Sequence, residues 1–250
     1  MKPTLSIIIL TWNQKDVLAK CINSLEATLQ AMPCEVIIID NGSTDGTAEW
    51  LKAQYPEFTL IKNTQNRGVA AARNQGIIAS NGEYILILDN DTVANHKAIS
   101  AMLSHLQSHA DTGIVACRLL NEDGSIQDSC KEYPGLILKI KNVLNIKNTA
   151  TFTTDSEGVI HPTYVIGACQ MFSRSLYNTI GLIDENIFYG PEDADFCIRA
   201  AKAGFHTSCI TSQSIFHIHR RATTHAIFSP LGIKHIKALL YFYTKHKRWL

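Results

Sequence analysis

Short apolar segments alternate with helical patterns over residues 5–117, and this alternation limits the possible folds more than any other feature. Residues 5–10 are apolar and rich in isoleucine, which is typical of a strand buried on both faces. Further strands are predicted at 36–39, 58–62, 84–88 and 113–117, with helices at 17–29, 44–55, 69–79 and 98–106 between them. This succession predicts an α/β fold with a mostly parallel central sheet and helices on both of its faces.

The second half of the chain is less regular. Residues 119–163 carry several glycines and two prolines among short mixed apolar runs, which predicts loops and small strands. After them we expect a strand at 164–172, a helix at 192–203, a strand at 206–210 and a helix at 233–246. No internal repeat or low-complexity linker interrupts the sequence, so residues 1–250 are interpreted as one domain with a smaller mixed region in its second half.

Composition excludes several classes of protein. The formal net charge of the 250 residues is +1, which argues against general nucleic-acid binding, because that binding depends on many phosphate contacts from a basic surface. The seven cysteines are scattered and have no C-x-x-C spacing, so a zinc knuckle or disulfide framework is not expected. We find no signal peptide and no run of about 18 apolar residues. A cytoplasmic protein is therefore expected, attached at most to the surface of a membrane.

Polar clusters follow three of the predicted strands, at residues 11–13, 40–46 and 89–91. Ligands of open α/β sheets bind at the carboxyl ends of the strands. The carboxylate of Asp40 could accept a hydrogen bond from a pyrimidine N3–H or from a ribose hydroxyl. The alternative interpretation is that Asn13 and Ser43 only cap helices. Neither a Walker A sequence nor G-x-G-x-x-G is present, which disfavours a P-loop NTPase or a dinucleotide-dependent dehydrogenase.

Asp89 and Asp91 lie just after a strand and share one face if that strand continues through them. Hard divalent cations such as Mg²⁺ and Mn²⁺ prefer carboxylate, water and phosphate oxygens. One carboxylate on a metal and the other on a ribose is a plausible division of roles. A D-x-D pair is weak by itself, but its position after the fourth strand strengthens the hypothesis.

Residues 66–76 contain small side chains that let a helix approach the sheet closely, and Arg73 lies at that boundary. The guanidinium could hold a base or a phosphate, or it could form a salt bridge. Trp12 and Tyr189 could stack on a base or a sugar ring, or pack at the rim of the core.

Carboxylates and imidazoles of the second half supply further candidates. Asp193 falls in the predicted first turn of a helix, where the helix dipole favours its ionised form. It could accept a proton, although an acidic helix start often has no catalytic meaning. Asp195 and Arg199 are four residues apart, so an ion pair is expected. His217 and His219 follow a predicted strand and could complete a metal shell, or they could be structural.

At this point the chain resembles the family 2 glycosyltransferases, which have the GT-A fold. The motifs that carry the resemblance run from Ser6 to about His219: 11–13, 40–46, 66–68, 73–74, 88–91, 167–171, 181–185 and 192–195. Within that family it looks closest to the rhamnosyltransferase-like enzymes of bacterial surface polysaccharides such as lipopolysaccharide. One departure concerns residues 220–224, which read RRATT where a glycine- or serine-rich segment is expected.

The resemblance implies inverting transfer of a sugar from a UDP- or dTDP-sugar, with a divalent metal, Mn²⁺ or Mg²⁺, on the diphosphate. By similarity Asp193 would be the general base, and Glu192 would orient it or bind the acceptor. Asp89 would contact the ribose and Asp91 the metal, with His217 or His219 as a further metal contact. The nucleotide site would include Thr11, Asn13, Asp40, Asn66, Arg73, Asp89 and Asn90.

The expected acceptor is a hydroxyl group of a growing bacterial glycan, and this glycan could be linked to a lipid. Residues 1–117 would form the nucleotide-binding half, 118–219 the acceptor side and 220–250 a helical tail. That tail mixes basic and aromatic residues and could lie on a membrane or pack on the domain. Two alternatives stay open: a sugar-nucleotide nucleotidyltransferase, and a non-catalytic module that binds nucleotide sugars or glycans.

Overall fold

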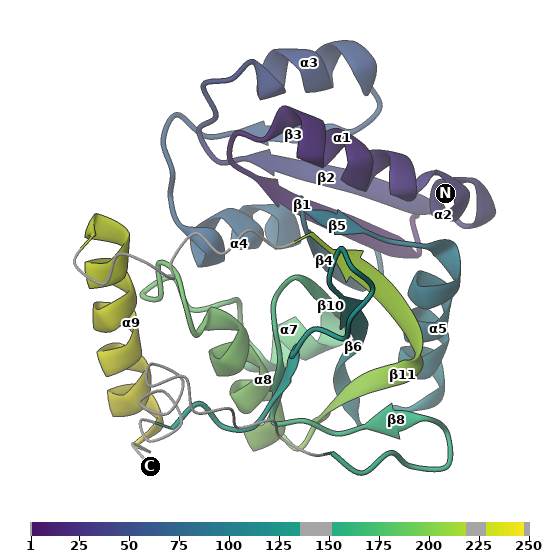
Figure 1. The fold of residues 1–250 in the computed structure, drawn as a ribbon, viewed down its shortest axis with the longest axis vertical. Coiled ribbons are helices and arrows are strands. Elements are labelled where there is room, and N and C mark those ends of the chain that lie inside the picture. Colours follow the sequence, from purple (N-terminus) through teal and green to yellow (C-terminus); the bar gives the residue numbers. More distant parts are fainter. Residues whose placement is uncertain (1, 136–151, 219–228, 248–250) are drawn as a thin grey trace.

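A mixed β-sheet forms the centre of the molecule (Figure 1). The computed structural model describes residues 2–135, 152–218 and 229–247. Across the sheet the described strands follow the order β3 (Thr59–Lys62), β2 (Cys34–Asp40), β1 (Leu5–Thr11), β4 (Tyr84–Asp89), β10 (Cys169–Ser173), β6 (Thr112–Leu120), β11 (His206–His217) and β5 (Thr92–Val93). Strand β8 (Val159–Ile160) pairs with β11, and β7 (Cys130–Lys131) pairs separately with β9 (Tyr164–Val165).

The direction of the strands divides the sheet into two parts. Strands β3, β2, β1 and β4 are parallel. Strand β10 is antiparallel to both of its neighbours, β4 and β6, and β6 is parallel to β11. The prediction of a mostly parallel α/β sheet is therefore confirmed, with a mixed region in the second half.

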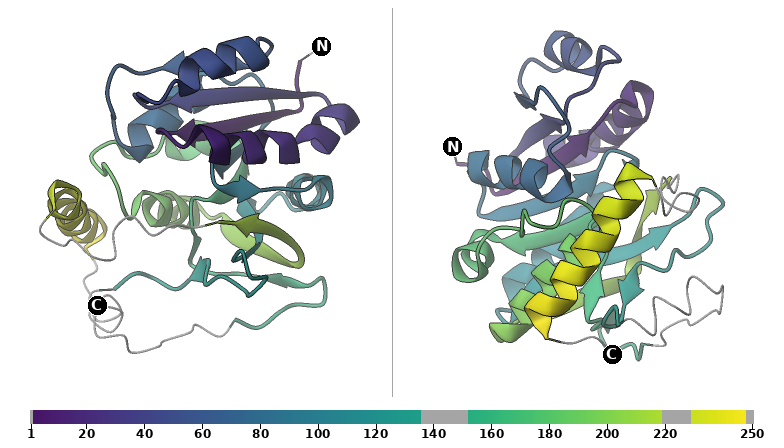
Figure 2. Two further views of the ribbon diagram at one scale, coloured as in Figure 1. Left: turned by 45° about the horizontal axis from the view of Figure 1, so that its top comes forward. Right: turned by 90° about the vertical axis from the view of Figure 1, so that its left-hand side faces the viewer.

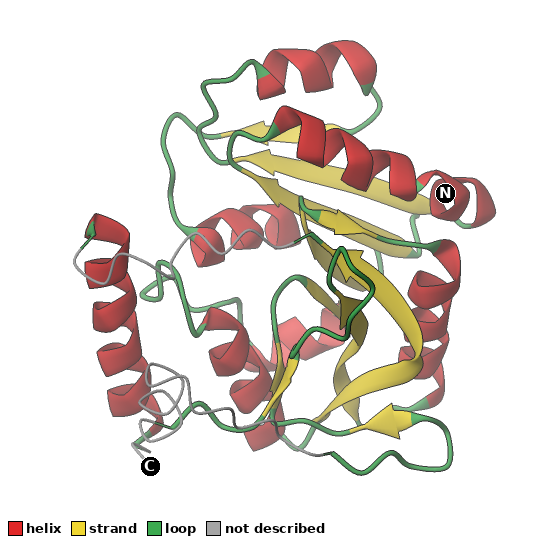
Figure 3. Cartoon of the chain, viewed as in Figure 1, coloured by secondary structure: helices red, strands yellow, loops and turns green. Residues whose placement is uncertain are grey.

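Helices cover both faces of the sheet, as predicted (Figure 3). Successive side chains of a strand point to opposite faces of the sheet. Ile7 and Ile9 of β1 belong to one buried cluster and Ile8 belongs to the other, so both faces are apolar and both must be covered. The first cluster includes α1 (Lys15–Ser24), α3 (Thr47–Gln54) and α5 (His96–Ser108), and the second includes α4 (Val69–Ala79), α7 (Arg174–Ile180), α8 (Glu192–Lys202) and α9 (Pro230–His246). Helix α2 (Glu26–Ala31) extends the first layer.

Several predicted boundaries are wrong. The helix expected over residues 17–29 is divided into α1 and α2 at Leu25. The strand expected over 164–172 is interrupted between β9 and β10, and helix α7 after it was not predicted. The strand expected over 206–210 continues to His217, because a shift of register after Ile210 lets the polar stretch that follows stay in the sheet.

Neither expected side-chain cap forms. Asn13 and Gln14 both have positive φ, and α1 begins after Gln14 without a side-chain cap. The side chain of Asn13 instead accepts a hydrogen bond from Thr44 N at 2.9 Å, and Ser43 Oγ accepts one from Asn13 N at 2.7 Å. These two bonds join the loop after β1 to the loop after β2.

Helix α9 crosses the outside of the molecule, as the right-hand view of Figure 2 shows. Ala238, Phe242 and Tyr243 are buried on its inner face. Of the helices in the described ranges, none is both long enough and apolar enough to cross a bilayer.

Candidate active site

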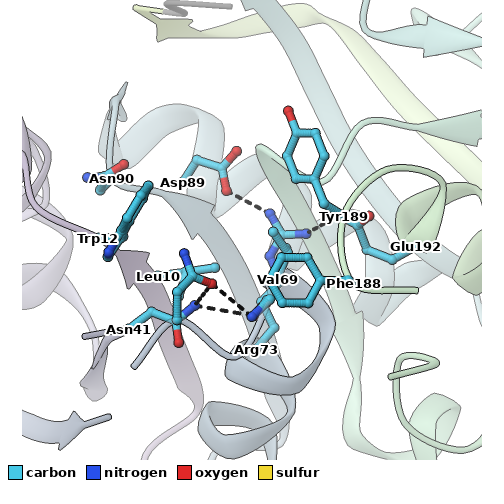
Figure 4. Close-up of a pocket in the computed structure, with 12 residues that line it drawn as sticks. Leu10, Trp12, Asn41, Val69, Arg73, Asp89, Asn90, Phe188, Tyr189 and Glu192 are labelled. Atoms are coloured by element: carbon cyan, nitrogen blue, oxygen red, sulfur yellow. Dashed lines mark hydrogen bonds and ion pairs between the residues drawn. The ribbon is translucent and has the colours of Figure 1, made fainter. Parts of the chain in front are cut away.

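A cavity of about 290 Å³ opens at the carboxyl ends of β1 and β4 (Figure 4). One wall comes from these strand ends and from the start of α4, and the other comes from the segment that leads into α8. The lining residues are Leu10, Trp12, Asn41, Asn66, Gly68, Val69, Arg73, Asp89, Asn90, Phe188, Tyr189 and Glu192. The cavity thus lies where parallel α/β sheets bind ligands, between segments that are far apart in the sequence.

The loops after β1 and β2 hold several predicted nucleotide-binding residues together. Asn90 Nδ2 donates a hydrogen bond to Thr11 Oγ1 at 3.0 Å. Asp40 is fully buried, and its Oδ1 accepts a bond from Ser43 N at 2.8 Å. Asp40 Oδ2 is buried too and has no hydrogen-bond partner within the described part of the chain. Such an acceptor is costly to leave unsatisfied, so Asp40 Oδ2 is a candidate to receive a donor from a ligand.

Asn66 shapes the turn that enters α4. Its Oδ1 accepts hydrogen bonds from Asn41 Nδ2 at 3.1 Å and from Gly68 N at 2.9 Å. Gly68 has a φ of +87°, and a Cβ at this position would approach Phe188 to 2.7 Å. Val69 N donates to Phe188 O at 2.9 Å, so the two walls of the cavity touch here.

Arg73 lies buried at the centre of the site. Its Nη2 donates to Asp89 Oδ1 at 2.6 Å and to Gly167 O at 2.9 Å, and its Nη1 lies 3.4 Å from Glu192 Oε1. Burial opposes its charge, but Asp89 and then Glu192 raise the pKa of Arg73 overall. The salt bridge that the sequence left open is therefore present, and a contact with a base or a phosphate stays a prediction.

Glu192 is buried beside the same guanidinium. Burial, and next the charge of Asp193, raise the pKa of Glu192 to about 8 although Arg73 opposes the shift. Because Asp89 already lies closer to Arg73, the guanidinium compensates Glu192 only in part. Glu192 Oε2 accepts a bond from Gly190 N at 2.9 Å, which ties the carboxyl group to the segment before α8.

Asp193 is half-buried at the start of α8, immediately after a residue that lines the cavity. Its Oδ2 accepts a hydrogen bond from Gly167 N at 3.1 Å, and Arg73 donates to the carbonyl oxygen of the same glycine. Gly167 therefore connects Asp193 to the centre of the site. The predicted ion pair of Asp195 with Arg199 is confirmed at 2.8 Å.

A cluster of two carboxylates and one imidazole lies next to the cavity. One ligand atom each of Asp89, Asp91 and His217 lies within 4.8 Å of the others. Pairing of His217 with Thr92 in the sheet brings β11 to this place, and His217 Nε2 lies 3.2 Å from Asp91 Oδ1. That oxygen is buried and has no hydrogen bond from any described residue. Oxygen-rich ligands with one imidazole fit Mn²⁺ or Mg²⁺.

Gln127 orients His217 from behind. The 2.7 Å contact between His217 Nδ1 and Gln127 Oε1 requires a proton on Nδ1, because the amide oxygen only accepts. The neutral ring then turns the lone pair of Nε2 toward Asp91, as in many metal sites. Burial alone would lower the pKa of His217, but Asp91 and then Asp89 raise it above its ordinary value. The prediction for His219 lies outside the described residues.

Sequence reasoning missed several residues of this site. Asn41 belonged to a recognised polar cluster but was not singled out, although it lines the cavity and contacts Asn66. Gln127 and Phe188 carried no local signal, because their positions depend on contacts with distant segments.

Residues 6–181 match the sequence model of the family described as Glycosyl transferase family 2. A relative from Mycobacterium tuberculosis, an N-acetylglucosaminyl-diphospho-decaprenol L-rhamnosyltransferase, is 25% identical over 100% of this chain and 87% of its own length. The dTDP-rhamnosyl transferase RfbF of Shigella flexneri is 24% identical over 87% of this chain and 70% of its own length.

Two solved structures share the fold. The mannosyltransferase PcManGT from Pyrobaculum calidifontis, in complex with GDP-Man and Mn²⁺, has a TM-score of 0.67 at 20% identity and matches 99% of this chain. GalNAc-T7 with UDP, GalNAc and Mn²⁺ has a TM-score of 0.70 at 14% identity and matches 98%. This chain spans only 65% and 50% of those two chains.

The match to the family covers more than half of the sequence, and the sheet, its helices and its structural neighbours agree with the GT-A fold. The predicted resemblance is confirmed, including its rhamnosyltransferase-like character, because two of the relatives above are rhamnosyltransferases. The chain belongs to glycosyl transferase family 2 and is a glycosyltransferase.

Proposed function

We propose that this enzyme transfers a sugar, with inversion, from a UDP- or dTDP-sugar to a hydroxyl group of a growing bacterial surface polysaccharide. Both relatives are named as rhamnosyltransferases, and the name of RfbF specifies a dTDP-rhamnosyl transferase, which favours a dTDP-linked deoxyhexose as the donor. The observation that carries the proposal is the cluster of Asp89, Asp91 and His217 beside a cavity whose opposite wall leads into Asp193.

The donor half of the site would hold the nucleotide. Asp40 Oδ2, which is buried and unsatisfied among the described residues, would accept a hydrogen bond from the base. Asp89, oriented by Arg73, would accept one from the ribose. Thr11, Asn13, Asn66 and Asn90 would shape the loops around them.

Asp91 and His217, with Asp89, would hold Mn²⁺ or Mg²⁺, and the bound cation would neutralise the negative charge that gathers on the leaving diphosphate. Gln127 would keep the imidazole of His217 in the tautomer that binds metal. The residue His219 is proposed as an additional contact from sequence alone.

Asp193 would take the proton of the acceptor hydroxyl as its oxygen attacks the anomeric carbon from the face opposite the diphosphate. A positioned base of this kind typically contributes about 10²- to 10⁴-fold to the rate. The bond from Gly167 N to Asp193 Oδ2 fixes the direction of the carboxylate. Glu192, whose pKa is raised, would hold the guanidinium of Arg73 in place. It would also form part of the cavity wall on the acceptor side.

The exposed apolar face of helix α9 suggests that the acceptor is located at a membrane surface. Its outer face exposes Ile233, Ile236 and Leu240 by 48%, 43% and 51%, at spacings that place them side by side. The helix has no acidic residue and begins beside the cavity, since Lys234 Nζ lies 3.6 Å from the centre of the Phe188 ring. We propose that this face binds an anionic membrane on the cytoplasmic side and brings the site to a lipid-linked glycan.

Residues 1–250 would act as one domain, with 1–117 holding the donor, 118–219 the acceptor side and 220–250 the tail. The test is a screen of nucleotide sugars by thermal shift with and without Mn²⁺, because a ligand that binds the folded state raises its melting temperature. A donor-consumption assay with the stabilising sugar follows. If neither UDP- nor dTDP-sugars shift the melting temperature in the presence of Mn²⁺, the proposal fails.

A further inference from the structure

A second group of metal-ligating side chains lies far from the cavity. One ligand atom each of His105, His109 and Glu157 lies within 4.8 Å of the others. His105 is on the last turn of α5, and Glu157 precedes β8, at the lower right of Figure 1. The strand that starts here, β6, runs parallel to β4, whose opposite end carries Asp89. The group is therefore at the other edge of the sheet.

The two histidines are arranged as a pair. Their rings stack with centroids 4.1 Å apart and planes inclined by 22°, as residues one helical turn apart do. His109 Nδ1 lies 3.0 Å from the carbonyl oxygen of His105, so the proton is on Nδ1, because a carbonyl only accepts. His109 Nε2 then presents its lone pair toward Glu157 Oε2, which is 3.3 Å away. A backbone carbonyl fixes metal-binding histidines in this way.

The loop that carries Glu157 is held in place. Asp155 Oδ1 accepts hydrogen bonds from Glu157 N and from Val159 N, both at 2.9 Å. Asp155 N donates to Val159 O at 2.9 Å, and the other carboxylate oxygen of Asp155 lies 3.5 Å from His161 Nε2. The carboxylate of Glu157 is thus presented from a structured turn.

We propose that His105, His109 and Glu157 bind one divalent transition-metal ion of borderline softness, such as Zn²⁺, with water in the remaining position. Two imidazoles and one carboxylate suit Zn²⁺ or Co²⁺, whereas the oxygen-rich cluster beside the cavity suits Mn²⁺ or Mg²⁺. The ion links the end of α5 to the loop before β8. This proposal does not depend on the proposed donor or acceptor.

The experiment titrates Co²⁺ into the Asp91→Asn variant, which removes a carboxylate of the other cluster, in excess Mg²⁺. Visible absorption reports Co²⁺ held by nitrogen ligands, and calorimetry gives its affinity. We expect one molar equivalent to bind. Adding His109→Ala or Glu157→Gln, both at partly exposed positions, weakens binding at least about tenfold. His96→Ala, at the other end of the same helix, leaves binding unchanged.

Two outcomes overturn the proposal. In the first, Asp91→Asn protein shows no saturable Co²⁺ binding, which means that His109 and Glu157 form only an ion pair. In the second, the His109→Ala and Glu157→Gln variants bind Co²⁺ as tightly as their parent. Circular dichroism of each variant verifies that it is folded.

Discussion

Arg73 Nη1 lies 3.4 Å from Glu192 Oε1 and joins the helix that follows the donor loops to the helix that carries Asp193. Both side chains are nearly completely buried, with 4% and 8% of their surface exposed. This contact is not primarily a source of electrostatic stability, because burial and the charge of Asp193 raise the pKa of Glu192 to about 8 and keep its carboxyl group mostly protonated at neutral pH. Its consequence is geometric, since it fixes the two walls of the cavity relative to each other.

The raised pKa of Glu192 predicts a dependence of stability on pH. The carboxyl group has an ordinary pKa of 4.5 and a pKa of about 8 in the folded protein, so the folded state binds its proton more tightly than the unfolded chain does. Stability from this group is complete below about pH 4.5 and decreases as the pH rises to about 8. Each unit of pKa corresponds to about 1.4 kcal/mol, so the total reaches a few kcal/mol.

The Glu192→Gln variant isolates this effect, because glutamine resembles the protonated carboxyl group and does not titrate. Urea denaturation of both proteins at several pH values gives the difference in their free energies of unfolding. We expect the wild type to lose stability relative to the variant between about pH 5 and 8. A difference that stays constant over this range would show that Glu192 is ionised throughout.

Asp193→Asn separates an enzyme from a binding module. Asparagine keeps the hydrogen bond from Gly167 N but cannot accept a proton, so we expect turnover to fall by about 10²- to 10⁴-fold while the affinity for donor stays within about twofold. Initial rates and calorimetry with the donor measure the two quantities. Asp123→Asn, in an exposed loop, is the control. Equal turnover in Asp193→Asn and wild type would remove the proposed base.

Gln127→Leu tests whether His217 binds metal. Leucine cannot accept the proton of His217 Nδ1, so the ring loses the partner that fixes its tautomer. Loss of such a partner costs about 10- to 100-fold in metal affinity. Titration of Mn²⁺ in the presence of the nucleotide measures it, and Gln30→Leu, at an exposed position of α2, is the control. An unchanged Mn²⁺ affinity in Gln127→Leu would mean that His217 does not ligate the ion.

The parallel half of the fold could be predicted from sequence because its signals are local. The apolar runs of β1, β2 and β4 are continuous, and the polar clusters at their ends reach the same edge of the sheet by topology alone. The position of His217 depends instead on pairing with Thr92 and on a register shift within β11. Neither is recorded in a local pattern, so the prediction ended that strand too early.

The contacts within the candidate site also could not be predicted from local sequence patterns. Asn13 and Ser43 have the composition of helix caps, yet they bond the neighbouring loop instead, because two strand ends bring these loops together. The salt bridge of Arg73 with Asp89 was one of two open interpretations, and only the three-dimensional structure, in which the side chain of Arg73 on α4 reaches Asp89 at the end of β4, selects it. Gln127 is recognisable as a partner of His217 only in three dimensions.

The exposed apolar face of α9 predicts binding to anionic vesicles. Replacing Ile233, Ile236 and Leu240 together by serine removes the aliphatic groups that would enter the lipid, and each such group contributes about 1.5 to 3 kcal/mol when fully buried. We expect binding to phosphatidylglycerol vesicles, measured by sedimentation, to weaken at least about tenfold. Vesicle binding by the wild type should also weaken as the salt concentration rises, because the lysines of α9 contribute to it.

Ile78 and Ile126 give a matched control for this experiment. They are 68% and 63% exposed and lie on other parts of the surface, so Ile78→Ser with Ile126→Ser leaves vesicle binding unchanged. Light scattering of the same proteins distinguishes a second explanation. If wild type is a dimer that the α9 substitutions dissociate, and vesicles bind neither protein, the apolar face is an interface between two copies of the chain.

The contacts of Asp195 predict how strongly α9 is attached to α8, the helix that carries the proposed base. Its side chain is fully buried and accepts from Arg199 Nε at 2.8 Å, from Lys245 Nζ at 2.6 Å and from His246 Nε2 at 2.9 Å. Asp195→Asn leaves Arg199 without its counter-charge, whereas Lys245 keeps a second carboxylate partner, Asp184, at 2.6 Å. Because Arg199 keeps 16% of its side-chain surface in water and Lys245 keeps its bond to Asp184, we expect the lower end of the cost of breaking a buried pair, about 3 kcal/mol.

Urea denaturation measures this loss, with Asp128→Asn as the control, because Asp128 forms an exposed ion pair with Lys131 and such pairs contribute at most about 1 kcal/mol. The loss in Asp195→Asn should also lower the affinity for vesicles, since α9 must stay on the domain to present its outer face. A cost below about 1 kcal/mol would mean that Phe242 and Tyr243, which are buried against the domain, hold the helix without help from the carboxylate.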